Sequence, residues 1–397
     1  MQIRKINDDE RAEFVRISRY AFGDWSDEEV KEAELEWADP RFIIGVFEDG
    51  RMAAALKCFT ADQSVRGVVK RMGGVSCVVT TPPYRNRGFA REVMQAAFED
   101  MRERGLDVSM LRPFRETFYG KLGYASTSSH MTVSIPAVAL GRWLRYEPGP
   151  GWSLDVAPTR DVLDEVQAFW RDEVMPRHHG MVRITEASAG EWGFWTKDKL
   201  VARAVQDGKT RGLIRYKKTA FGAEGKLDAA EFFWTDDASR ELLLHYLARH
   251  RDQVAEVKLR LPYGINFQSW LEDVPRRIDA EVFHLPWMVR LMDITSALTG
   301  LPAAEAGEIK FAVADDQCPW NARAYRLWCD GETLQVKPHE DEPALSLHIR
   351  GISALAYGAL DTAELARRGW LSGASEAEAA LLDTWFPPLV LYNPVDF

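Results

Sequence analysis

The chain has 397 residues, of which 46% are hydrophobic and 28% are charged, a balance that excludes a wholly disordered protein or a disulfide scaffold. Its 50 basic and 60 acidic side chains give a net charge of −10, which argues against general nucleic-acid binding and suits cationic ligands. At about 150 residues per domain, this length predicts two or three domains.

The four cysteines are sparse and form no C-x-x-C pair, which argues against a zinc site or a redox dithiol and fits a reducing cytoplasm. The first ten residues lack the apolar run of a signal peptide, and no run of about 20 apolar residues is present to span a membrane. We therefore expect a cytoplasmic protein with no metal, nucleic-acid or membrane partner.

Helix and strand patterns alternate along the first 130 residues. Helical spacing, period-two or wholly apolar runs, and an Asp-Gly hairpin turn define the elements. In chain order we expect a helix over 10–22, strands over 42–47, 52–59 and 75–80, a helix from 89 that ends near Gly105, a strand over 106–111 and a short helix over 118–122.

The loop before the helix at 89 reads Arg85-x-x-Gly88-x-Ala90 and carries further arginines. Backbone N–H groups at a helix N-terminus favour anions, and glycine lets a phosphate approach the backbone closely. The pattern is neither a P-loop nor a dinucleotide fingerprint. The loop is therefore a candidate phosphate site, and the alternative is a helix start with solvated arginines.

A Pro/Gly-rich stretch at 144–152 indicates a linker, and the order of hairpin, strand, helix and strand then recurs about 150 residues after its first occurrence. This recurrence predicts an internal duplication. The repeated elements are strands over 200–205, 213–216 and 229–234, a helix over 237–250 and a strand over 255–261.

From about residue 287 a third segment has strands first and helices later, which is typical of an α+β domain. Strands are expected over 308–313, 324–329 and 333–336, and helices over 352–360, 362–368 and 375–385. Residues 387–397 are unusually apolar for a terminus, which indicates that they are bound against other parts of the protein.

The order of the strand, the R-x-x-G-x-A loop, the helix, the next strand and the stretch FYGKLGY at 118–124 resembles the GNAT N-acetyltransferase superfamily over about residues 1–130. In that superfamily the loop holds the pyrophosphate of acetyl-CoA, and the later motif supplies a tyrosine beside the departing thiolate. The resemblance implies acetyl-CoA as cosubstrate.

Over its whole length the chain resembles the enhanced intracellular survival (Eis) family, bacterial acetyl-CoA-dependent aminoglycoside N-acetyltransferases. At 118–124 Lys121 replaces the arginine of the family's Tyr-Gly-Arg-Phe-Gly-Tyr stretch. The resemblance implies two tandem GNAT-like domains, the second degenerate, and a C-terminal sterol-carrier-protein-like α+β domain, with bounds 1–148, 149–285 and 286–397. It also implies a homohexamer.

Carried over by position, the resemblance makes Tyr119 the general acid that protonates the CoA thiolate, which suits a phenol with a pKa near ~10. It makes the C-terminal carboxylate of Phe397 the general base, delivered by the third domain. A pKa near ~3.5 is low for a base, although burial raises it. Alternatively, this carboxylate desolvates and orients an ammonium group.

The resemblance also places the cofactor contacts. The strand over 78–80 would pair with the pantetheine arm, and the loop would bind the pyrophosphate. Phe114 and Arg115 lie at a further family contact, where this sequence departs from the usual small and acidic residues. The other cofactor candidates are Val78, Val79, Thr80, Asn86, Arg87, Gly88, Phe89, Ala90 and Arg91.

The acceptor site is expected at the N-terminal helical region, where aromatic rings and carboxylates together suit a polyamine such as an aminoglycoside. The candidates are Phe22, Asp24, Trp25, Asp27, Trp37 and Asp396. Three other readings stay open: an acetyltransferase for lysine or small-metabolite amines, a CoA-sensing protein that carries an apolar ligand without turnover, and a scaffold.

Overall fold

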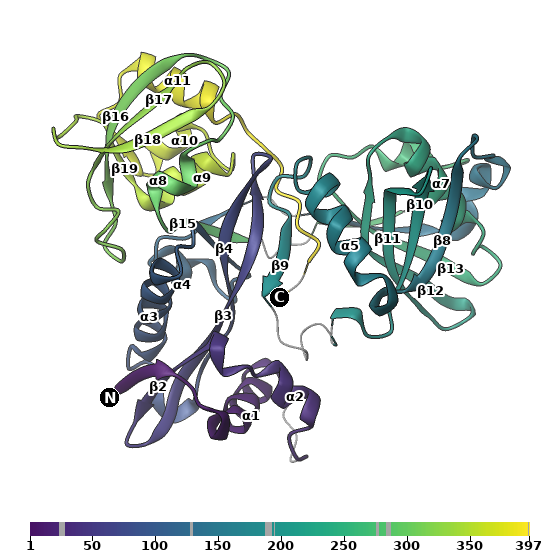
Figure 1. The fold of residues 1–397 in the computed structure, drawn as a ribbon, viewed down its shortest axis with the longest axis horizontal. Helices are drawn as coiled ribbons and strands as arrows, with labels where there is room; N and C mark the ends of the chain where they lie inside the picture. The colour runs from purple at the N-terminus through teal and green to yellow at the C-terminus, as the bar shows by residue number, and fades with distance from the viewer. Residues whose placement is uncertain are drawn as a thin grey trace.

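The computed structural model describes residues 1–23, 28–127, 130–186, 193, 195–274, 278–282, 287–395 and 397, which form three β-sheets with helices packed on them (Figure 1). The first sheet has the order β1-β2-β3-β4-β5-β15-β6, and β9 pairs with β3. The second has the order β14-β7-β13-β12-β11-β10-β8, and the third has the order β18-β17-β16-β19-β20.

The first sheet and its helices form the N-terminal GNAT domain. Its strands are β1 (Gln2–Lys5), β2 (Ile43–Glu48), β3 (Arg51–Val65), β4 (Val68–Thr80), β5 (Val108–Leu111), β6 (Ala125–Ser126), β9 (Val182–Glu186) and β15 (Met288–Leu291). Its helices are η1 (Asp8–Glu10), α1 (Arg11–Phe22), α2 (Glu32–Trp37), η2 (Pro40–Phe42), η3 (Pro82–Tyr84), α3 (Phe89–Glu103) and α4 (Glu116–Gly120).

The alternation of side chains along β2 shows how this sheet is covered on both faces. Ile43 and Phe47 belong to the same apolar cluster as Phe14 of α1, whereas Ile44 and Val46 belong to the cluster of α3. Successive residues of a strand point to opposite faces, so α1 and α3 cover opposite faces of the sheet. The expected helix stop at Gly105 is confirmed, since Gly105 follows the end of α3 with φ of 63°.

The second sheet forms the second GNAT domain. Its strands are β7 (Met131–Pro136), β8 (Trp152–Pro158), β10 (Leu200–Gln206), β11 (Lys209–Thr219), β12 (Gly222–Trp234), β13 (Val254–Leu261) and β14 (Asp279–Val282). Its helices are η4 (Ala137–Arg145), η5 (Thr159–Val162), α5 (Leu163–Phe169), η6 (Trp170–Val174), α7 (Asp237–Ala248) and η7 (Phe267–Trp270). The predicted repetition of hairpin, strand, helix and strand is confirmed by the elements β10–β11, β12, α7 and β13.

The third sheet and the helices around it form the sterol-carrier-like domain. Its strands are β16 (Gly307–Ala314), β17 (Ala324–Cys329), β18 (Leu334–His339), β19 (Ser346–His348) and β20 (Leu371–Ser372). Its helices are α8 (Ile294–Leu298), α9 (Ile349–Ala356), α10 (Thr362–Arg367) and α11 (Glu376–Trp385). No helix in the described part of the chain has the length and hydrophobicity needed to cross a bilayer.

Strand pairing crosses the predicted domain bounds in two places. β7, expected in the first domain, pairs with β13 and β14 of the second sheet. β15, expected in the third domain, pairs with β5 and β6 of the first sheet. The Pro/Gly stretch is irregular over 146–151, but it joins η4 to β8 within the second domain and is not a linker between domains. A local pattern identifies a strand without identifying its partner, so these positions needed tertiary information.

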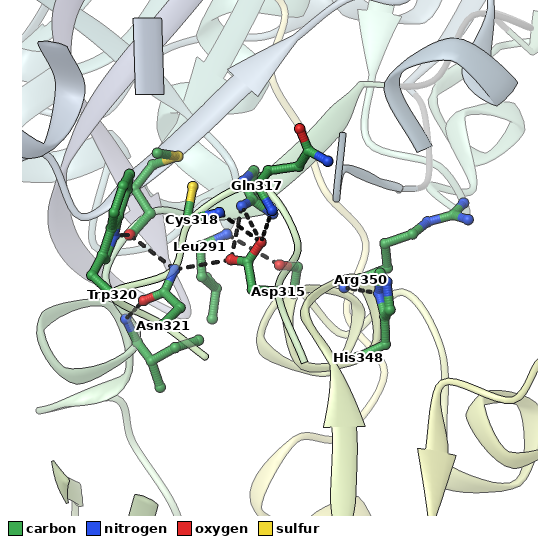
Figure 2. A network of polar contacts seen from close by, with 12 residues as sticks. Leu291, Asp315, Gln317, Cys318, Trp320, Asn321, His348 and Arg350 are labelled. Carbon is green, nitrogen blue, oxygen red and sulfur yellow. Dashed lines mark hydrogen bonds and ion pairs between the residues drawn. The ribbon is translucent and has the colours of Figure 1, made fainter. Parts of the chain in front are cut away.

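A buried ion pair fixes the third domain against the first sheet. Arg290 of β15 donates to both oxygens of Asp315 at 2.8 Å, and both side chains have no exposed surface. Figure 2 shows Asp315 at the centre of this network, where its oxygens also accept from the backbone N–H groups of Gln317 and Cys318 and from the amide of Asn321. Asp315 therefore accepts five hydrogen bonds from both sides of the interface.

We predict that Asp315→Asn lowers the free energy of unfolding by about 3–5 kcal/mol, because it leaves the buried Arg290 guanidinium without a counter-charge. Urea denaturation measures the change. Glu308→Gln is the control, since the Glu308–Arg326 pair is more than one-third exposed on each side and its loss costs less than about 1 kcal/mol. Equal effects of the two substitutions would contradict this account.

The C-terminal tail, residues 387–397, runs from the third domain between the hairpin of β3 and β4 and the second domain, and ends near β9 (Figure 1). His178 lies beside it, with its ring 5.6 Å from that of Tyr392 and 5.3 Å from that of Phe233. Burial lowers the pKa of His178 and of its neighbour His179 to about 4. Both imidazoles are thus neutral in the folded chain at pH 7. The predicted binding of this apolar segment against other parts of the protein is confirmed.

Below about pH 6.5 these histidines take up protons in the unfolded chain but not in the folded chain, so the free energy of unfolding falls as the pH drops toward 4. We predict that His178→Phe, which keeps an aromatic ring but cannot titrate, reduces the loss of stability between pH 7 and pH 5 by about 1–2 kcal/mol. Urea denaturation at both pH values measures this difference. An unchanged loss in the variant would rule out His178 as a source of acid sensitivity.

Candidate active site

The first sheet opens between β4 and β5. The two strands run parallel and pair over Met72–Val75 and Val108–Leu111. β4 continues to Thr80 and pairs there only with β3, while β5 has ended. Cys77 sits at a bulge with φ of 51°, where the register with β3 shifts by one residue. Within the described residues, the edge of β4 over 76–80 therefore has no strand beside it on the β5 side.

The α3 N-terminus follows directly from this open edge. Gly88 is the N-cap with φ of 89° and gives α3 no side-chain cap. No described residue accepts from the backbone N–H groups of Gly88, Phe89 and Ala90. A Cβ atom at Gly88 would meet nothing within 4 Å. The loop thus presents unused donors and the positive end of the helix dipole to open space.

The basic residues of the loop differ in their roles. Arg87 donates to Glu48 at 2.7 Å and its guanidinium lies 5.0 Å from the ring centre of Phe89, so a neighbouring carboxylate partly offsets its charge. Arg91 is exposed on the first turn of α3. Phe89 itself is buried in the core, so only its backbone can contact a ligand. Val79 is likewise buried, whereas Val78 and Thr80 are half-buried at the open edge.

Tyr119 lies on the α3 face of the sheet, in the same apolar cluster as Val75 and Leu111, the last paired residues of β4 and β5. Its side chain is 3% exposed, and its hydroxyl forms no hydrogen bond to any described residue. Burial raises its pKa well above the ordinary value, which keeps the phenol protonated. The exposed ring of Phe114 lies 5.7 Å from the Tyr119 ring. Arg115, the N-cap of α4, is also exposed.

Phe397 lies on the opposite face of the sheet. Its ring stacks on Trp287 at 4.7 Å and meets the edge of Phe59 at 5.0 Å. Phe59 pairs with Gly74 of β4, one residue before the last β4–β5 pair. Arg112, one residue after β5, lies 4.5 Å above the Trp287 ring. These contacts place the side chain of residue 397 beside the end of β4–β5 pairing.

Of the candidate residues for the acceptor site, the structure describes Phe22 and Trp37. Phe22 ends α1 and is 58% exposed. Trp37 stacks on Phe14 at 5.6 Å, and its carbonyl accepts from Lys57 at 2.7 Å. Lys57 pairs with Ser76 at the start of the open edge, so the α1–α2 region borders this edge. Asp24, Trp25, Asp27 and Asp396 lie outside the described residues.

The second GNAT domain lacks these features. The N-cap of its helix α7 is Asp236, whose own carboxylate accepts from the Ser239 N–H at 2.8 Å and pairs with Arg211. The Asp236 carboxylate therefore occupies the place at the helix N-terminus that a bound anion would take. Behind it, Arg215 and Glu231 form a buried ion pair. The second copy is thus degenerate as an anion site, because Thr235-Asp236-Asp237-Ala238 stands where the first copy has its glycine loop.

Sequence reasoning missed several residues that shape the site, namely Cys77, Arg112, Trp287 and Asn393. Neither a bulge, as at Cys77, nor the pairing of a strand with a distant sheet has a local sequence pattern. Trp287 joins the site only because the strand that follows it, β15, enters the first sheet. Within the described residues, no group of three His, Cys, Asp or Glu side chains is placed to hold a metal ion.

Comparisons with known proteins agree with this architecture. Models of an acetyltransferase (GNAT) domain match residues 2–127 and again 170–291, and a sterol carrier protein domain matches residues 294–392. An uncharacterized N-acetyltransferase of Streptomyces coelicolor is 26% identical over 381 residues, covering 87% of this chain and 88% of the relative.

Two solved structures share the fold over the whole chain. A GCN5-related N-acetyltransferase from Kribbella flavida has a TM-score of 0.81 at 21% identity, covering 100% of this chain and 98% of that one. Eis1 from Mycobacterium abscessus has a TM-score of 0.79 at 17% identity, covering 100% of both. The chain thus consists of two acetyltransferase (GNAT) domains and a sterol carrier protein domain, and it is an N-acetyltransferase of the GNAT type.

Proposed function

We propose that the protein transfers the acetyl group of acetyl-CoA directly to an amine of a polyamine-type acceptor such as an aminoglycoside. One observation carries this proposal: Tyr119 and Phe397 pack in apolar clusters on opposite faces of the first sheet, which opens beyond the last β4–β5 pair, and the open edge of β4 leads to the uncapped α3 N-terminus. An acetyl-CoA molecule held in this opening would have the Tyr119 phenol on one side and the terminal carboxylate of Phe397 on the other.

The open edge of β4 and the α3 N-terminus fit acetyl-CoA. Backbone groups over 78–80 can pair with the amides of the pantetheine arm, and the free N–H groups from Gly88 to Ala90 can bind the pyrophosphate. Asn86, Arg87 and Arg91 lie exposed around this loop, and Phe114 and Arg115 are exposed at the start of α4. Bound acetyl-CoA supplies an acetyl group activated as a thioester.

Tyr119 serves as the general acid. As the C–S bond breaks, the phenol donates its proton to the CoA sulfur and regains one afterwards from water. Burial keeps this proton in place at all physiological pH values. A neutral donor in an apolar cluster stabilises a developing thiolate more strongly than water does.

The carboxylate of Phe397 serves as the general base. It accepts the proton that the attacking amine loses as the new C–N bond forms. The packing of its ring between Phe59 and Trp287 holds the end of the tail at the opening. Partial burial raises the pKa of a carboxyl group and so improves it as a base.

The chemistry of the surroundings supports a cationic acceptor. The net charge of −10 attracts polycations, and the exposed ring of Phe22 and the half-buried ring of Trp37 offer aromatic surface for ammonium groups. We assign Asp24, Trp25 and Asp396 to the same acceptor site. We also propose that the protein works as a cytoplasmic homohexamer, and its four cysteines, none of which is in a disulfide, suit a reducing compartment.

We predict that Tyr119→Phe lowers kcat by about 10²–10⁴-fold, the usual contribution of a general acid, and leaves the Kd for acetyl-CoA within about threefold. The substitution removes one hydroxyl and keeps the ring packing. Thiol release measures turnover, and calorimetric titration measures binding. Unchanged turnover would remove the acid role of Tyr119.

We predict that adding three glycines after Phe397, or deleting Phe397, lowers turnover at pH 7 by about 10²-fold or more while acetyl-CoA still binds. Both changes move the terminal carboxylate away from the opening and leave the cofactor loop untouched. The same glycines inserted after Ala220, in the exposed turn between β11 and β12, are the control. Full activity of either C-terminal variant would contradict the terminal base.

A further inference from the structure

The last residues of the tail bend around one buried side chain, that of Asn393. It has no exposed surface. Its amide nitrogen donates to the carbonyl of Val395 at 3.0 Å, and its amide oxygen accepts from the Val395 N–H at 3.3 Å. This pair of bonds closes a tight turn over residues 393–395, of the kind that Asn side chains favour.

The same side chain ties this turn to the first domain. The Asn393 amide oxygen also accepts from the backbone N–H of Val182 in β9, at 3.3 Å. The Asn393 carbonyl accepts from the indole N–H of Trp287 at 3.3 Å. Trp287 in turn stacks on the Phe397 ring. One residue thus connects β9, the turn of the tail and the aromatic support of residue 397.

The contacts upstream of the turn fix its position along the second domain. The Tyr392 N–H donates to the His179 carbonyl at 2.8 Å, and the Tyr392 hydroxyl donates to the carbonyl of Arg260 in β13 at 2.9 Å. Arg260 donates to the Pro394 carbonyl at 3.1 Å. These bonds hold residues 392–394. The bend of the chain after Pro394 is held by the two bonds between the Asn393 side chain and Val395.

We propose that Asn393 is the positioning residue that aims the terminal carboxylate of Phe397 at the opening between β4 and β5. This inference rests on the proposed function, because it assigns Asn393 a role through the base named there. Val395 closes the turn and Phe397 lies two residues beyond it, so the two bonds between Asn393 and Val395 bend the chain just before its last residue. Without the Asn393 side chain, Val395 loses both of these bonds and Val182 loses a third, so the end of the tail is held less firmly against the first sheet.

Asn393→Ala tests the proposal, with spermidine as the acceptor and thiol release as the readout. We expect kcat to fall about tenfold or more at pH 7 with an unchanged Kd for acetyl-CoA. The deficit should shrink to within about threefold by pH 9.5, because hydroxide, which is more abundant at high pH, can take the proton of the attacking amine in place of the carboxylate. A merely structural defect would not recover with pH.

Asn321→Ala is the matched control. Asn321 is also fully buried, donates to Met292 and Asp315, and accepts from Ile294, all at the distant interface of Figure 2. We expect it to lower the melting temperature without changing the pH dependence of kcat. If both variants show the same recovery at high pH, or neither does, the positioning role is wrong.

Carboxypeptidase A, which removes C-terminal aromatic residues, tests the position of the tail without any turnover. We expect Phe397 to be released at least about tenfold faster from Asn393→Ala than from the wild-type protein or Asn321→Ala, as measured by intact mass. Equal release rates would overturn the proposal. If Asn393→Ala releases Phe397 faster but keeps full activity at pH 7, Asn393 orders the tail but the terminal carboxylate has no part in the mechanism. That outcome would overturn the terminal base of the proposed function.

Discussion

The path of residues 387–397 is the constraint on which the arrangement of this protein depends. This tail leaves the third domain, passes the second domain and ends on the sheet of the first, so it contacts all three (Figure 1). Arg66, in the turn between β3 and β4, donates to carbonyls of Ala356 and Pro387 and so fixes the start of the tail. The buried pair of Arg290 and Asp315 fixes the domain from which the tail starts.

The two GNAT domains show how one fold supports two different uses. In the first, Gly88 leaves the helix N-terminus uncapped, and the end of β4–β5 pairing at Val75 and Leu111 leaves the edge of β4 open. In the second, Asp236 caps the equivalent helix. Beyond the last β12–β13 pair, Tyr392 of the tail packs on Phe233 and bonds to Arg260. The position that would hold the acetyl donor in the first domain is thus the position against which the tail packs in the second domain.

Much of this organisation could be predicted from local sequence. Helical periodicity and Asp-Gly turns located α3 and the hairpins, and the glycine loop located the uncapped N-terminus of α3, because these features are set within a few residues. The exchange of β7 and β15 between sheets could not be predicted, since a strand of only six or four residues fits either sheet equally well. Asn393 was also missed, because its partners Val182 and Trp287 are far from it in sequence.

The most direct test of this account is thiol release from acetyl-CoA by the purified protein with aminoglycosides, polyamines and lysine peptides in parallel. We expect turnover with compounds that carry several amines, and slower turnover with single lysine side chains. Turnover confined to lysine peptides would contradict the assigned acceptor class. Binding of acetyl-CoA without thiol release from any amine would contradict direct transfer between the two faces of the first sheet.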